Sequence, residues 1–101
     1  MELLEELTIT LIKPITRGSA DAVTELKLRE PMAGELDRMA RAAAKAGSGV
    51  AGMNMLISAI SGVELPFIEK CLSARDYRRA EVYLSAFLSD SPADGAASSP
   101  T

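Results

Sequence analysis

Histidine and tryptophan are absent from this sequence of 101 residues, and cysteine occurs once, at Cys71. Without histidine, a serine or cysteine nucleophile lacks its usual general base. A lone cysteine cannot form a zinc site, and no acidic run has the spacing of a calcium loop. One cysteine also permits no disulfide within the chain, so folding needs no oxidising compartment. We therefore expect no enzyme: no catalytic residue, no cofactor and no metal.

Long hydrophobic runs are also missing. The most apolar stretch, 50–60, contains Asn54 and Ser58 and is about half the ~20 residues that a membrane span requires. Residues 1–6 contain three glutamates, where a secretory signal would carry basic residues. These features predict a soluble intracellular protein without a membrane partner.

Charge of one sign does not dominate, and the net charge is −3. Basic residues form two groups: Arg38, Arg41 and Lys45, and Lys70, Arg75, Arg78 and Arg79. Acidic residues are interleaved with both groups, and aromatic residues for base stacking are nearly absent. The pattern favours salt-bridged, solvated faces over nucleic-acid binding, and we expect every acidic side chain to lie on such a face. A small nucleic-acid-binding regulator remains the alternative, and its binding would weaken steeply with salt.

The N-terminal part alternates between apolar and polar residues, which is the period of a half-buried strand. Leu7, Ile9 and Leu11 alternate with threonines up to Pro14, which ends the strand or marks its edge. Leu26 and Leu28 alternate with charged residues in the second run. Because a short loop with a glycine joins the runs, we expect an antiparallel hairpin at about 7–29. Its apolar face needs a partner layer.

The rest of the chain has helical spacing. Helices are predicted at about 32–46, 50–61, 66–72 and 74–88, with Ser73 as the N-cap of the last one. The glycines at 47, 49 and 52 are interpreted as helix ends and hinges. The fold class is therefore α+β, a small hairpin packed on about four helices in one domain, 1–88. Residues 89–101 have no apolar side chain larger than alanine, apart from proline, and are expected to be disordered.

Two helices carry more apolar surface than a small core needs. Val50, Met55 and Ala59 lie away from the line of Met53, Leu56 and Ile60 on the second helix. Val82 and Tyr83 lie off the main stripe of the fourth. We expect these off-stripe residues to be exposed and to bind a partner. They are Val50, Met55, Ala59, Val82 and Tyr83.

The order of motifs resembles a known family. Ile9-Thr-Leu-Ile-Lys-Pro is followed by Leu28-Arg-Glu-Pro-Met-Ala-Gly-Glu-Leu, and later by Asp76-Tyr and Ala86-Phe-Leu. This arrangement is similar to the tail assembly chaperones of Mu-like and P2-like contractile-tailed bacteriophages. The resemblance covers about residues 7–88, and Leu-Arg-x-Pro-x-Ala-Gly is its most specific part.

The resemblance implies a function that composition does not reveal. Such chaperones bind the tape measure protein, whose length sets the tail length, and keep it soluble while tail tube subunits polymerise. They act in the host bacterial cytoplasm and are left out of the mature virion. In many of them a ribosomal frameshift produces a longer form, which would be a further partner, and self-association is plausible. A generic protein-interaction domain is the second alternative.

Overall fold

The computed structural model describes residues 5–16, 18 and 21–88, and the expected disordered segment 89–101 lies outside them. A two-stranded antiparallel hairpin is followed by four helices, which confirms the α+β class. The elements are β1 (Glu6–Ile15), β2 (Val23–Arg29), α1 (Ala33–Ala46), α2 (Gly49–Ser61), α3 (Leu65–Cys71) and α4 (Ala74–Leu88).

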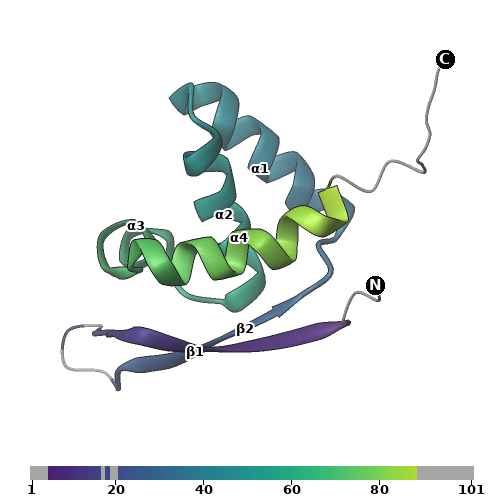
Figure 1. Ribbon diagram of the computed structural model, residues 1–101. Helices are drawn as coiled ribbons and strands as arrows, with labels where there is room; N and C mark the ends of the chain where they lie inside the picture. The colour runs from purple at the N-terminus through teal and green to yellow at the C-terminus, as the bar shows by residue number, and fades with distance from the viewer. Residues whose placement is uncertain (1–4, 17, 19–20, 89–101) are drawn as a thin grey trace, which may run out of the picture.

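The helices lie on one side of the hairpin (Figure 1). α2, α3 and α4 pack on the hairpin, whereas α1 packs on α2, and these two helices project away from the strands. The core forms between the apolar face of the hairpin and the three covering helices. Its fully buried members include Ile15, Leu26, Leu56, Ile57 and Leu84. The alternation in the strands thus gives the buried layer that the sequence predicted.

One irregularity interrupts the hairpin. Thr10 pairs with Glu25 and Ile15 pairs with Val23, so residues 11–14 of β1 lie opposite Thr24 alone. β1 therefore continues through Pro14 instead of ending there. A bulge of this kind frees backbone groups from the ladder, and a proline is tolerated at such a place.

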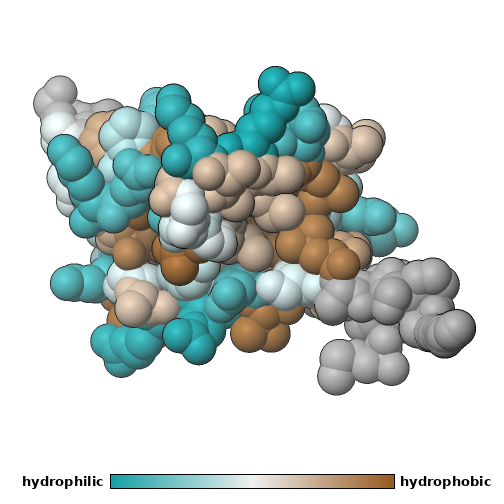
Figure 2. Space-filling model, turned by 90° about the horizontal axis from the view of Figure 1, so that it is seen from above, coloured by the Kyte–Doolittle hydropathy of each residue, from teal (hydrophilic) through white to brown (hydrophobic). Residues whose placement is uncertain are grey.

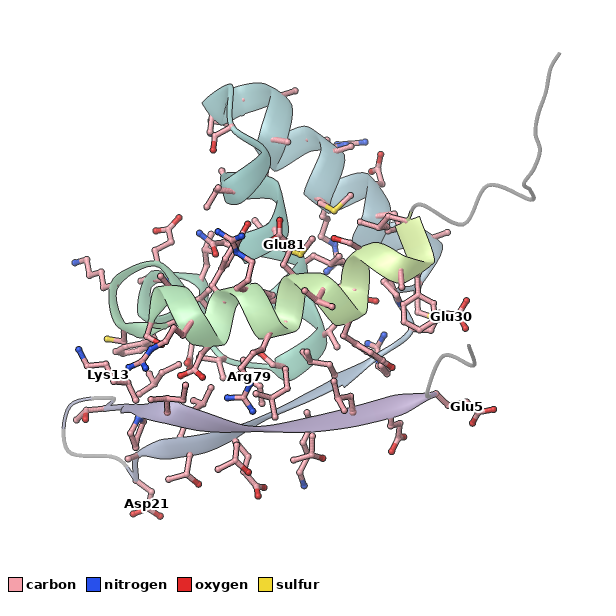
Figure 3. All side chains as sticks on the ribbon, in the orientation of Figure 1. Glu5, Lys13, Asp21, Glu30, Arg79 and Glu81 are labelled. Atoms are coloured by element: carbon pink, nitrogen blue, oxygen red, sulfur yellow. The ribbon has the colours of Figure 1, made fainter. Side chains whose placement is uncertain are left out.

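Asp76 in the first turn of α4 binds the backbone groups freed by the bulge. Its carboxylate accepts hydrogen bonds from the Ile12 N–H (2.9 and 3.1 Å) and the Lys13 N–H (3.2 Å). Arg79 Nη1 donates to Asp76 Oδ1 (2.9 Å) and to the Thr10 carbonyl (2.8 Å), and Figure 3 shows Arg79 between α4 and the hairpin. We call Asp76 and Arg79 with this backbone the bulge clamp.

The expectation that every acidic residue is solvated is wrong for Asp76, which is fully buried. Burial raises the pKa of its carboxyl, but hydrogen bonds from Ile12, Lys13, Ser73 and Arg79 outweigh that effect and leave the pKa below its ordinary value. The Ser73 hydroxyl also accepts a hydrogen bond from the Asp76 N–H (3.2 Å), as the predicted N-cap requires. The clamp therefore fixes α4 against β1.

The same expectation is wrong for Glu35, which joins α1 to β2. Arg29 donates two parallel hydrogen bonds to Glu35, at 2.9 and 2.7 Å, and the Met32 N–H donates a third at 2.8 Å. The hydrogen bonds from Arg29 lower the pKa of Glu35 to about 2, against the effect of burial. The carboxylate thus caps the helix and pairs with the strand.

α1 and α2 approach each other closely at Gly52. A Cβ at Gly52 would lie 2.9 Å from the Met39 carbonyl oxygen and 2.9 Å from the Ala43 Cβ. The hinge interpretation is therefore wrong for Gly52, because this buried glycine lies inside α2 and allows the two backbones to touch.

Gly52→Ala should destabilise the protein by about 1–3 kcal/mol. The methyl group meets backbone at Met39, which cannot give way as a side chain can, and this outweighs the ~1 kcal/mol that alanine gains in a helix. Gly34→Ala is the control, because its Cβ would meet nothing within 4 Å. We expect urea unfolding to show Gly34→Ala unchanged or up to about 1 kcal/mol more stable. Equal effects at both sites would contradict the close approach.

Asp76→Asn should cost about 2–4 kcal/mol at neutral pH, because the amide cannot accept all the hydrogen bonds of the clamp. Urea unfolding measures the loss. Because the pKa of Asp76 is lowered by folding, the stabilisation is present above the ordinary carboxyl pKa and disappears in acid. Asp37→Asn, at an exposed ion pair with Arg41, should change stability by less than about 1 kcal/mol. A similar loss in both variants would exclude a special role for Asp76.

Glu35→Gln should lower the free energy of unfolding by about 1–3 kcal/mol at pH 7. Folding lowers the pKa of Glu35 from 4.5 to about 2, so this stabilisation is full above pH 4.5 and fades as pH falls to about 2. The difference between Gln and Glu variants should therefore shrink across that window in thermal unfolding. Glu25→Gln, on the exposed face of β2, is the control. A difference that is constant with pH would contradict the ionised pair.

Candidate protein-binding groove

A groove of about 630 Å³ is formed by α1, α2 and α3. We call it the α1–α3 groove. Its apolar lining consists of Ala42, Ala46, Ala51, Met55 and Leu65. Met55 is partly buried and lines the groove opposite small side chains from α1, and methionine adapts its shape to different partners. The lining is therefore suited to apolar contact with a variable surface.

Charged side chains also line the α1–α3 groove. Arg38, Arg41 and Lys45 come from α1, and Glu69 comes from α3. All four are exposed, whereas most of the apolar lining is partly buried, so the charges form the border. On the face seen from above, apolar surface lies among hydrophilic groups (Figure 2). Such an apolar centre with a polar rim is typical of protein interfaces.

The structure brings only part of the predicted partner-binding set into this groove. Met55 lines it, and Ala59 follows one helical turn later on the same side of α2, outside the lining. Val50 is 54% exposed and lines a second hollow with Ile68 of α3, Leu72 just after α3, and Tyr77 of α4. Glu69 borders both hollows. The role of these residues in binding remains a prediction.

The expected exposure on α4 holds for Val82 and fails for Tyr83. Val82 is 68% exposed, whereas Tyr83 is 8% exposed and belongs to the core. The Tyr83 ring packs edge-to-face on Phe87 with centroids 5.3 Å apart. Tyr83 is buried because α4 packs on both strands. More of the surface of α4 therefore faces the core than its single apolar stripe would predict. Tyr83 therefore offers little surface to a partner.

Sequence reasoning missed the contribution of α1 to the groove. Ala42 and Ala46 are four residues apart and so share one face of α1. Ala42 lies four residues after Arg38 and three before Lys45, so these cations flank the same face. This spacing was the available signal, yet alanines alone do not distinguish a groove from a solvated helix. The cations were expected to form salt bridges. Arg41 pairs with Asp37 at 3.0 Å, while Arg38 and Lys45 form no salt bridge within the described residues.

Other kinds of site are not apparent in the part of the chain that the structure describes. Within it, no three His, Cys, Asp or Glu side chains come together as metal ligands would. None of the helices α1 to α4 is long and apolar enough to span a membrane. Cys71 is a free, partly buried thiol in α3. The α1–α3 groove is thus the candidate functional site.

Comparison with known families assigns this small α+β protein to a class. A family profile described as phage tail assembly chaperone proteins, E, or 41 or 14, matches residues 8–89. The match covers most of the sequence, so the chain belongs to the phage tail assembly chaperone family. Membership implies protein partners in tail assembly and suggests a role without catalysis. No curated protein and no solved structure gives a significant match.

Proposed function

We propose that this chaperone binds helical segments of its phage's tape measure protein and keeps that protein soluble while the tail tube polymerises. It would act in the host cytoplasm and leave the assembly when tail tube subunits displace it. A longer, frameshifted form of the chain and further copies of itself are the other partners that we propose. This role requires reversible binding, so the site needs a surface that contacts the partner and needs no catalytic residue.

The observation that supports the proposal most is the α1–α3 groove itself. Met55, Leu65 and three alanines line this hollow between α1, α2 and α3. A groove between helices with an apolar lining is the common receptor for an amphipathic helix. Because α1 and α2 extend away from the hairpin, a long partner helix can approach without meeting the strands.

Apolar residues outside the groove extend the proposed contact surface: Val50 and Val82 are exposed and Ala59 is partly exposed. Val50 in the second hollow lies one residue before Ala51 of the groove, and Glu69 borders both. Ala59 and Val82 are the more distant candidates on α2 and α4. We propose that the groove with Val50 forms the centre of the interface, because Val50, Ala51 and Met55 lie in adjoining turns of α2.

Nucleic-acid binding has weaker support than protein binding. The cations of α1 border an apolar hollow that also carries Glu69, whereas a phosphate backbone favours an uninterrupted positive surface. The aromatic rings Tyr83 and Phe87 pack on each other, and Tyr83 is buried, so it offers no platform for a base.

The proposal predicts that Ala42→Glu disrupts binding and that Ala44→Glu does not. Both residues lie on α1, but only Ala42 lines the groove. A carboxylate over the apolar lining loses hydration when the partner binds, which should weaken binding roughly tenfold or more. The measurement is the soluble fraction of the tape measure protein, and its co-purification with the chaperone, after co-expression in bacteria.

Met55→Glu and Val82→Glu test which surface binds the partner, because Met55 lines the groove and Val82 lies on α4 outside it. Circular dichroism must show each variant folded before its binding is interpreted. We expect Met55→Glu to behave like Ala42→Glu, with Val82→Glu having a smaller effect. If folded Ala42→Glu and Met55→Glu keep the tape measure protein as soluble as the wild type does, the groove is not the site. If Val82→Glu alone fails, the interface lies on α4.

A further inference from the structure

We infer that the α1–α3 groove selects its partner by charge: it takes an amphipathic helix with acidic residues along one flank and a basic residue on the other. This inference rests on the proposed function, and it specifies the kind of helix that the groove accepts. The observation that carries it is the unequal distribution of charge around the apolar lining, with cations on the α1 side and a carboxylate on the α3 side.

The cations form a regular row. Arg38, Arg41 and Lys45 are spaced by three and four residues, so they lie along one side of α1. The row spans roughly 10 Å, since a helix rises 1.5 Å per residue. Arg41 is joined to Asp37 by an ion pair whose side chains are 79% and 60% exposed, and a pair so exposed is weak. All three cations are therefore available to a partner.

The opposite side of the groove carries the other sign. Glu69 is exposed on α3, and no salt bridge to another described residue engages its carboxylate. The next residue, Lys70, does not line the groove. A helix lying between α1 and α3 thus meets positive potential on one flank and negative potential on the other. Its own acidic residues must therefore face α1 and its basic residue must face α3.

The partner's sequence pattern follows from this geometry. Its apolar residues should recur at i, i+3, i+4 and i+7, to fill the lining around Met55. Acidic residues three to four positions apart on one flank match the row on α1, and a lysine or arginine on the other flank matches Glu69. Exposed charges add little affinity each, so apolar burial holds the complex while charge chooses the helix and its orientation.

A pair of designed helical peptides tests the inference directly. The first peptide has a leucine face with three glutamates on one flank and one lysine on the other. The second has the same leucine face with three lysines and one glutamate in those positions. Fluorescence anisotropy with the full-length wild-type chain should show the first peptide binding roughly tenfold more tightly at low salt. The preference should shrink as ionic strength rises, because the border charges are exposed.

Charge reversal on the protein is the complementary test. Arg38→Glu, Arg41→Glu and Lys45→Glu together should reverse the preference between the two peptides. The matched control reverses three cations outside the groove: Lys27→Glu, Arg75→Glu and Arg78→Glu. The control should keep the wild-type preference although its net charge has changed equally. If circular dichroism shows that the groove triple variant is unfolded, the comparison of the two peptides on the wild-type chain still tests the charge preference.

The outcomes separate the inference from the proposed function. If both peptides bind equally and Ala42→Glu weakens both, the groove binds helices without charge selection, and only this inference fails. If neither peptide binds, or Ala42→Glu has no effect on their binding, the groove is not a helix receptor and both proposals fail. If a 20-base-pair DNA duplex displaces the first peptide at low concentration, the cations serve a polyanion, and the inference is overturned.

Discussion

The buried Asp76 carboxylate is the interaction on which the arrangement of this small domain depends. β1 departs from its ladder at residues 11–14, and backbone N–H groups left unpaired in a core would cost about 1–3 kcal/mol each. Asp76 accepts hydrogen bonds from two of them, and Arg79 reaches the carbonyl of Thr10 beside them. The same two residues belong to α4, so satisfying the bulge also sets how α4 crosses the hairpin. The apolar contacts of Leu84 and Tyr83 with the strand layer then follow.

The motifs that resemble the family are explained largely by this kind of contact. Asp76 of the Asp-Tyr motif binds the backbone just before Pro14 of the Lys-Pro motif, although 63 residues separate Asp76 from Lys13. In the Leu-Arg-x-Pro-x-Ala-Gly segment, Arg29 holds the Glu35 that follows it. These residues hold the strands against the helices and do not line the α1–α3 groove. The signature therefore identifies the fold, and the specificity of binding must be sought in other residues.

Local patterns predicted the parts of the structure that local physics controls. Alternation placed Leu26 and Leu28 in the core, and spacing predicted Ser73 as the cap of α4. Patterns could not show that the Asp76 carboxylate turns inward, because its partners come from a distant strand. They also misplaced Tyr83, since a helix that packs on two strands buries more than one stripe. Met55 was found as surplus apolar surface, but the groove around it requires three helices to meet, which no single segment encodes.

The attachment of α1 has a consequence for the mechanics of the molecule. α1 packs on α2 and has no other extensive contact with a described element, apart from the Glu35–Arg29 tie at its first turn. A displacement of α1 relative to α2 would therefore leave the contacts between the hairpin and its covering helices in place. One wall of the groove can therefore tilt while the core stays intact. A receptor with one compliant wall can accommodate helices of different thickness without unfolding.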